Sequence, residues 1–170
     1  MPAQYLDEYI RELRRDGEPT FRQHHPEPVL IVTRAEGEMG EADAGAETTV
    51  MADTSGWRIQ QVSLLNRVFP VSRGPFATAR PILLGRTDAA DISIPNDSVS
   101  KKHCLFEAKA DAMIVTDCGS TNGTSVNDVA LVPNQPQSLQ GGDKLTMGHF
   151  SFAYHTADSF IAYLKTVVKI

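Results

Sequence analysis

The chain has 170 residues, of which 41% are hydrophobic and 22% charged, so it can fold as one ordinary domain with appendages and is not wholly disordered. The net charge of −5 is unevenly distributed, because residues 1–56 carry five Lys/Arg against twelve Asp/Glu, whereas residues 57–170 carry eleven against nine. Two regions with different roles are therefore expected, and the acidic total argues against a nucleic-acid partner.

The short apolar runs and the few cysteines limit the class of protein further. A membrane-spanning helix needs roughly 20 apolar residues, and no run in the sequence approaches that length. The first residues lack the basic and apolar regions of a secretory signal. Cys104 and Cys118 form neither a disulfide framework nor a CxxC metal-binding pair. We expect a reduced, cytoplasmic protein without a membrane partner.

Residues 1–33 are predicted to form an N-terminal extension that begins with a helix over about residues 3–16. The apolar side chains of this helix recur at helical spacing at Tyr5, Leu6, Tyr9, Ile10 and Leu13. Gly17 and Pro19 are expected to end it and to open a connector. The apolar run at residues 29–33 is long enough for one short strand.

The rest of the chain divides into three further segments. Residues 34–56 are acidic with little to bury, which predicts a disordered linker. Residues 57–156 contain short apolar runs separated by turn residues at intervals of about ten, a pattern typical of a β-sandwich or barrel. Residues 157–170 are predicted to form an amphipathic helix, capped by Asp158 or Ser159. We expect its apolar stripe to dock on the sandwich or the N-terminal helix; the alternative is that it binds a partner or mediates dimerisation.

The sequence contains no motif that indicates catalysis. HExxH, the P-loop, GxSxG and GxGxxG patterns are all absent. The five histidines show no metal-ligand spacing, and the pair His24-His25 is typical of a solvent-facing surface. His103 and Cys104 are neighbours in a predicted strand, where they would point to opposite faces and could not act as a dyad. We therefore expect no enzyme activity, no metal and no cofactor.

Polar residues gather instead in the loops between the predicted strands. In chain order they are Gly85-Arg86, Ser100 with His103, Gly119-Ser120-Thr121-Asn122-Gly123-Thr124 with Val126-Asn127, and Gly142-Asp143 with Gly148. Their order and spacing resemble those of the forkhead-associated (FHA) domain, whose pattern is GR, SxxH, GSxNGTxVN and GDxxxxG. The match covers roughly residues 57–156. It implies a mainly β fold, an FHA-type antiparallel β-sandwich, flanked here by the helical extension and the C-terminal helix.

The resemblance also implies a site for phosphothreonine peptides. Arg86 would make a charge-assisted contact to phosphate oxygens, Ser100 would donate a hydrogen bond, and Lys101 would add charge. Thr121 matches a phosphate-contacting position, and Asn122 would hold the peptide backbone. These donor types suit a dianionic group with three acceptor oxygens.

Four further residues are implied to support this site rather than to bind. His103 is expected to brace the loops from within, and Gly85, Gly119 and Gly123 to supply backbone geometry at turns. Cys104 departs from the usual family residue and is expected to be a small buried side chain. Cys118 also departs from the pattern, but neither cysteine occupies a phosphate-contacting position.

The acidic linker contains Glu47-Thr48-Thr49, which loosely resembles a motif ahead of the FHA domain in certain bacterial regulators of 2-oxoglutarate metabolism. The resemblance implies that Thr48 or Thr49 is phosphorylated and captured by Arg86 and Ser100. The alternative is that both are ordinary linker residues. Because the termini of FHA domains lie opposite the binding loops, capture between two chains is as plausible as capture within one.

The function implied is a non-enzymatic phosphothreonine-peptide-binding adaptor or regulator in Ser/Thr kinase signalling. Its partner would be a phosphothreonine-containing protein, either a Ser/Thr kinase or a substrate of one. The alternative is a structural or assembly protein that uses the sandwich and the terminal helices for phosphate-independent docking. Peptide selectivity and oligomeric state do not follow from the sequence.

Overall fold

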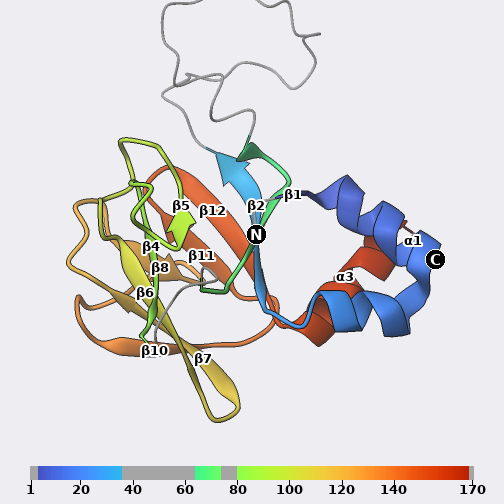
Figure 1. Ribbon diagram of the computed structural model, residues 1–170. Coiled ribbons are helices and arrows are strands. Elements are labelled where there is room, and N and C mark those ends of the chain that lie inside the picture. Colours follow the sequence, from blue (N-terminus) through green and yellow to red (C-terminus); the bar gives the residue numbers. More distant parts are fainter. Residues whose placement is uncertain (1–3, 36–63, 74–79, 169–170) are drawn as a thin grey trace, which may run out of the picture.

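The structure is a computed structural model that describes residues 4–35, 64–73 and 80–168. Within these residues, two β-sheets pack face to face and two helices lie beside them (Figure 1). The predicted β-sandwich with an N-terminal and a C-terminal helix is confirmed. No helix of the described segments is long and apolar enough to cross a membrane.

The first sheet has seven strands and the second has five. In spatial order the first contains β1 (Gln4–Tyr5), β3 (Arg67–Pro70), β2 (Val29–Ala35), β12 (Phe150–His155), β11 (Lys144–Met147), β8 (Thr124–Val126) and β9 (Val129–Ala130). The second contains β10 (Pro136–Leu139), β7 (Ala112–Asp117), β6 (Cys104–Lys109), β4 (Ile82–Gly85) and β5 (Ile92–Ser93). The strand pairs are antiparallel except for β4 with β5, which is parallel. The core between the sheets draws side chains from both, including Leu84, Phe106 and Phe152.

Strand β2 lies inside the first sheet, between β3 and β12, although the sequence analysis assigned residues 29–33 to an N-terminal extension. Leu30 and Val32 face the core between the sheets, whereas Val29 and Ile31 face the helices. Because both faces of the strand are covered, its apolar run is continuous and shows no alternation. The strand therefore belongs to the sandwich. It also extends to Ala35, two residues into the predicted linker, whose remainder lies outside the described residues.

Helix α1 (Leu6–His24) continues eight residues beyond the predicted end at residue 16. Gly17 interrupts it at φ 76° and ψ 163°, values that a helix does not contain. Pro19 follows in the first turn of the second segment, where its missing N–H has no partner to lose. The residues that predicted a helix end therefore produce a kink, and Figure 1 shows α1 turning back on itself.

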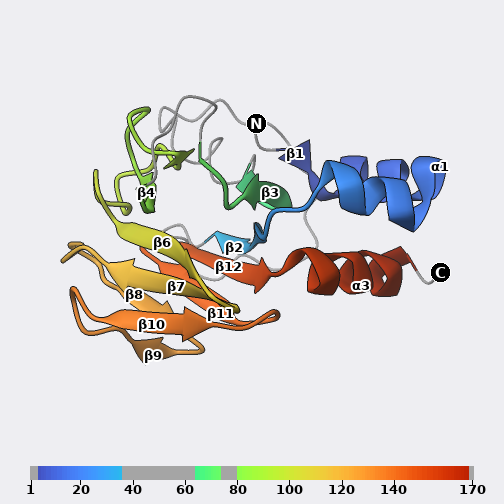
Figure 2. The same cartoon turned by 60° about the horizontal axis from the view of Figure 1, so that its bottom comes forward.

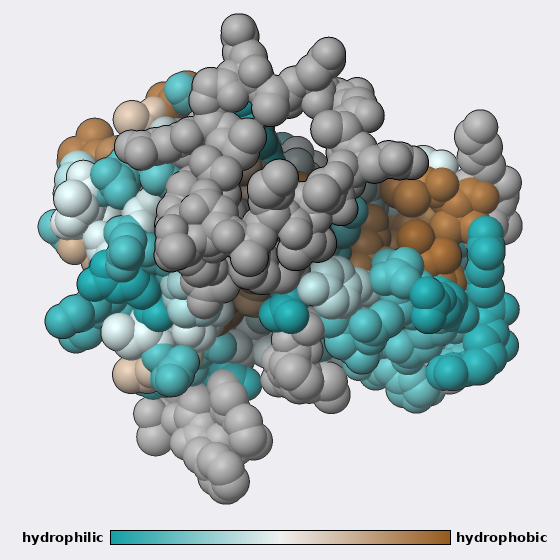
Figure 3. Space-filling view, turned by 90° about the horizontal axis from the view of Figure 1, so that it is seen from above, coloured by the Kyte–Doolittle hydropathy of each residue, from teal (hydrophilic) through white to brown (hydrophobic). Residues whose placement is uncertain are grey.

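The two segments of α1 pack with α3 (Ala157–Val168) in a helical layer beside one end of the first sheet (Figure 2). This second hydrophobic cluster consists of Leu6, Tyr9, Leu13, Phe21, Val29, Ile31, Val68, Phe160, Ile161 and Leu164. The C-terminal stripe was expected to dock on the sandwich or on the N-terminal helix, and in this cluster it contacts both. Viewed from above, apolar and polar side chains of the helical layer gather on different sides (Figure 3).

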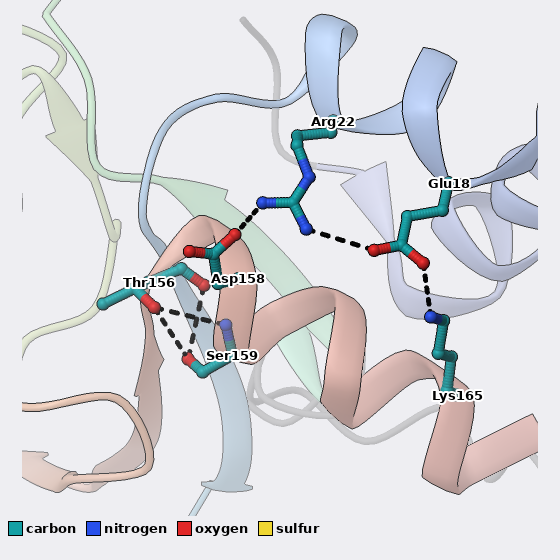
Figure 4. Close-up of polar contacts among 6 residues, drawn as sticks. All are labelled: Glu18, Arg22, Thr156, Asp158, Ser159 and Lys165. Atoms are coloured by element: carbon teal, nitrogen blue, oxygen red, sulfur yellow. Dashed lines mark hydrogen bonds and ion pairs between the residues drawn. The ribbon is translucent and has the colours of Figure 1, made fainter.

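Salt bridges join α1 to α3 at the edge of this helical layer (Figure 4). Glu18 pairs with Lys165 of α3 and with Arg22, and Arg22 also contacts Asp158. The N-terminus of α3 is capped by Thr156, whose Oγ1 accepts the Ser159 N–H at 3.2 Å, so neither Asp158 nor Ser159 is the cap. A single residue, Thr156, therefore separates the end of β12 from the start of α3.

Candidate functional site

Three loops meet at one end of the sandwich. The first follows β4 and carries Arg86, the second leads into β6 and carries Ser100, and the third joins β7 to β8 and carries Thr121. A Cβ placed on Gly85 would lie 2.0 Å from the carbonyl oxygen of Lys101, so only glycine permits this approach. The backbone N–H of Arg86 donates to the Ser100 carbonyl at 3.0 Å. The end of β4 and the Ser100 loop are therefore fixed to each other by backbone contacts.

Arg86, Ser100, Lys101 and Thr121 line one shallow depression of about 540 Å³, together with Asp97, Val99 and Lys102. Within it, the Thr121 N–H donates to Ser100 Oγ at 3.0 Å, which joins the second loop to the third. Four of the five predicted phosphopeptide-binding residues thus lie around the same surface. The sequence analysis did not place Lys102 or Asp97 among the binding residues.

The guanidinium of Arg86 is held only loosely. Its Nη1 lies 3.4 Å from Oδ1 of Asp97, whose side chain is fully exposed. Such an exposed pair contributes little free energy, so an incoming anion can replace Asp97 at small cost. Among the described residues, neither Lys101 nor Lys102 makes a salt bridge. The depression therefore presents three cations, with one acidic side chain at its rim.

Asn122, the fifth predicted binding residue, follows Thr121 directly. Its Nδ2 donates to the Ser98 carbonyl at 2.8 Å, and Oδ1 has no partner within the described part of the chain. One end of the amide is thus anchored while the other can meet an extended peptide. Ser98 is itself buried, and its Oγ accepts the His149 N–H at 3.0 Å, which ties the β11–β12 turn to the site.

His103 is fully buried and joins two of the loops. Its Nδ1 accepts the Ser100 N–H at 3.0 Å, so Nδ1 carries no proton. In the neutral ring Nε2 is therefore the donor, and it lies 3.1 Å from the Gly123 carbonyl. Burial lowers the pKa of His103 below its ordinary value, which favours this neutral form. The imidazole spaces the loops and does not face the depression.

Asp117 organises the third loop, and the sequence analysis missed it. Its carboxylate accepts the backbone N–H groups of Gly119 and Ser120 and the hydroxyls of Ser120 and Thr124. Burial acts to raise the pKa of Asp117, but these hydrogen bonds outweigh it and the pKa lies below its usual value. An Asp two residues before a glycine in a polar stretch is typical of an Asx turn, a signal that could have identified it.

The geometry of the depression suits the binding of an anionic group. Burial raises the pKa of Cys104 well above its ordinary value, so this thiol stays protonated and unreactive. Arg86, Lys101, Lys102 and nearby hydroxyl and amide groups instead offer several donors to one anionic group. Thr48 and Thr49 lie outside the described residues.

Comparison with known proteins adds an independent finding. A model of the family described as the FHA domain matches residues 82–148. An oxoglutarate dehydrogenase inhibitor of Corynebacterium efficiens is 37% identical over 90 residues, which cover 49% of this chain and 61% of that protein. An uncharacterized protein of Mycobacterium bovis is 30% identical over 124 residues, or 69% of this chain and 74% of that protein. The chain spans about three fifths of the length of the inhibitor it matches.

A solved structure supports the fold. The solution structure of the FHA domain of an Arabidopsis thaliana hypothetical protein superposes with a TM-score of 0.52 at 20% sequence identity. The alignment covers 77% of this chain and 86% of that one. At this identity the likeness concerns the architecture of the sandwich and not its ligand.

Proposed function

This chain belongs to the FHA domain family, and from this membership we propose that it is a non-enzymatic adaptor that binds phosphothreonine peptides in Ser/Thr kinase signalling. One observation carries the proposal: Arg86, Ser100, Lys101 and Thr121 come from three separate loops and line one depression. A sandwich with a purely structural role has no need to gather these donors at one place.

The charge and chemistry of a phosphothreonine fit this set of donors. The phosphate carries nearly two negative charges and three acceptor oxygens. Arg86 supplies a charge-assisted hydrogen bond, and Lys101 supplies a second cation. Each hydrogen bond to a charged group contributes about 1.5–3 kcal/mol, so two or three of them support micromolar binding after the cost of association.

The test begins with an oriented phosphothreonine peptide library, screened against the full chain to find a tight-binding peptide. Calorimetry then compares that peptide with its unphosphorylated form. We expect Arg86→Ala to weaken binding about 10- to 100-fold, because one charge-assisted contact is lost. Arg11→Ala is the matched control, since Arg11 is exposed on α1, far along the chain from the loops, and pairs only with Asp7 among the described residues.

Binding that ignores the phosphate, or that persists unchanged in Arg86→Ala, would favour the rival proposal of phosphate-independent assembly. In that proposal the terminal helices form the docking surface. The structure offers it limited support, because Phe160, Ile161 and Leu164 of α3 are already buried against α1 and the sheet. We therefore retain the phosphopeptide adaptor as the better account.

We propose as partner a phosphothreonine-containing protein, either a Ser/Thr kinase or a substrate of one. The similarity to an oxoglutarate dehydrogenase inhibitor makes a regulated metabolic enzyme a further candidate. The acidic segment with Thr48 and Thr49 is the third candidate, as a ligand within the same chain. Each would present its phosphate to Arg86 and Ser100.

The position of β2 bears on capture within one chain. Ala35, where the described part of β2 ends, pairs with Phe150, and the neighbouring His149 is bonded to Ser98 beside the site. The acidic segment therefore follows Ala35 at the same end of the sandwich as the binding loops.

The acidic segment is long enough for phosphorylated Thr48 to be captured within its own chain. Thr48 is thirteen residues from Ala35, a maximum span of about 45 Å at 3.5 Å per residue. Kinase-phosphorylated full chain should then bind the selected phosphopeptide more weakly than unphosphorylated chain, at any protein concentration. A Thr48→Ala/Thr49→Ala double variant should not change upon kinase treatment. Equal peptide affinity before and after phosphorylation of Thr48 or Thr49 would exclude the intramolecular ligand while leaving the adaptor proposal intact.

A further inference from the structure

The kink at Gly17 assembles a group of side chains that the linear sequence keeps apart. In a straight helix, Glu12 and His24 would lie about 18 Å apart along the axis. Here the chain turns back, and His24 Nδ1 lies 3.3 Å from Glu12 Oε1. Asp16 stands one helical turn after Glu12 on the same face. One ligand atom from each of the three residues lies within 4.8 Å of the other two.

His25 approaches the same carboxylate from the interior. Its Nε2 lies 3.0 Å from Glu12 Oε1, and its side chain is only 14% exposed, in contrast to the surface position expected for the pair. The ring packs against Tyr9 and Phe21, with centroids 5.0 and 4.6 Å away. Buried Nε2 makes no hydrogen bond of acceptable geometry with the described residues.

Two imidazole nitrogens therefore converge on one carboxylate oxygen. At these distances each nitrogen either donates an N–H to Glu12 Oε1 or, through its lone pair, shares a cation with that oxygen. We infer that Glu12, Asp16 and His24 form a binding site for a divalent first-row transition metal such as Zn²⁺, with the buried His25 ring packed beside the Glu12 carboxylate.

The donor chemistry selects this class of ion. An imidazole ligand suits zinc and its neighbours, whereas Mg²⁺ and Ca²⁺ prefer sites made only of oxygen. Tetrahedral Zn²⁺ with bonds of 2.0–2.1 Å places its ligand atoms about 3.3 Å apart, which matches the separation of His24 Nδ1 and Glu12 Oε1. The two carboxylates balance the charge of the ion.

The contact between Asp16 and Arg15 is compatible with this site. Both carboxylate oxygens accept Arg15 nitrogens at 2.7 Å, but each oxygen has a second lone pair available to a metal. The Arg15 side chain is 73% exposed and can also leave without disturbing the fold. A bound ion would join the two segments of α1 across the kink and so stabilise the hairpin that packs on α3.

The test uses the full chain without a histidine tag, stripped of metal with a chelator and desalted. Calorimetric titration with ZnCl₂ should show one site per chain, and MgCl₂ and CaCl₂ should give no binding heat. Co²⁺ in place of Zn²⁺ should give the visible absorption of a site with nitrogen and oxygen ligands. His24→Gln should weaken Zn²⁺ binding at least tenfold, and Glu12→Gln should do the same.

Two controls separate this site from nonspecific binding. Glu8→Gln removes an exposed carboxylate of the same helix, and His149→Gln removes an exposed imidazole elsewhere; both should bind Zn²⁺ as the wild type does. Because His24 is 54% exposed, its variant should fold normally, and Zn²⁺ should raise the melting temperature of the wild type but not of His24→Gln. Unchanged affinity in His24→Gln and Glu12→Gln, or the absence of a saturable single site, would overturn the inference.

Discussion

At the scale of single residues, one imidazole holds two loops of the candidate site at a fixed spacing. His103 accepts from Ser100, a proposed phosphate donor, and donates to Gly123, which directly follows the proposed peptide-binding residue Asn122. Ser100 in turn accepts from Thr121 through its hydroxyl. A change at His103 is therefore expected to alter both the stability of the domain and the positions of its phosphate donors.

We predict that His103→Ala lowers the free energy of unfolding by about 2–3 kcal/mol, because it removes a fully buried side chain and leaves the part-buried Ser100 N–H and Gly123 carbonyl without this partner. Urea unfolding at pH 7.5 measures this loss. Lys109→Ala, an exposed change in the β6–β7 hairpin, serves as the control and should stay within about 0.5 kcal/mol of the wild type. A loss below 1 kcal/mol in His103→Ala would contradict the bracing role.

The same variant should change the pH dependence of stability. Burial lowers the folded-state pKa of His103, so the unfolded chain binds the proton more readily. The contribution of neutral His103 to the free energy of unfolding is fully present above its unfolded-state pKa of about 6.5. It is lost as the pH falls through its folded-state pKa. Unfolding free energies between pH 7.5 and 5 should therefore fall less steeply in His103→Ala than in the wild type. The slope that remains includes His155, whose pKa burial also lowers.

At the scale of elements, α1 acts as two short helices joined by one glycine. Each segment alone is too short to be stable in water, so its helical form depends on burying Tyr9, Leu13 and Phe21 against α3 and the sheet. The kink sets the direction of the second segment, and through it the position of the pair His24-His25.

We predict that Gly17→Ala lowers the free energy of unfolding by about 1–3 kcal/mol. The conformation at φ 76° and ψ 163° is accessible essentially to glycine alone. Chemical denaturation measures the change, and Thr20→Ala, exposed on the same helix, is the control. If the kink positions His24 as proposed, Gly17→Ala should also weaken Zn²⁺ binding; a variant with the stability of the wild type would show that the hairpin tolerates another geometry.

At the scale of the whole molecule, two hydrophobic cores share one strand. Alternate residues of β2 face the sandwich and the helical layer, and Val68 and Phe69 of β3 are divided in the same way. Melting of the helical layer would expose Val29 and Ile31 on a strand whose other face belongs to the sandwich. The helices are therefore coupled to the domain and are not independent appendages.

We predict that Leu164→Ala, which truncates a fully buried side chain of α3, lowers the free energy of unfolding by about 2–5 kcal/mol. Helical circular dichroism and the near-ultraviolet signal of the sandwich should still report one coincident transition. Val167→Ala, a 46% exposed position of the same helix, should cost less than about 1 kcal/mol. Two separate transitions in Leu164→Ala would show that the layers unfold independently.

The sequence by itself determined the class of the fold and the composition of the candidate site. Short apolar runs between turn residues predicted the sandwich, because strand periodicity and turn chemistry are local properties. The loop residues Arg86, Ser100, Lys101, Thr121 and Asn122 could be selected because their order along the chain resembles that of a known family. Asp117 was missed, although an Asp two residues before a glycine in a polar stretch is a local signal of an Asx turn.

Only the tertiary structure decided which segments meet. Val29–Ala35 reads as an isolated strand in the sequence, but pairing with β3 and β12 makes it the strand shared by both cores. Gly17 and Pro19 predict the end of a helix, and packing against α3 instead keeps the chain helical beyond them. The approach of His24 to Glu12, and of Ala35 to the binding end of the sandwich, follows from these long-range contacts. Local sequence determines turns and periodicity, whereas burial against distant residues determines where each element points.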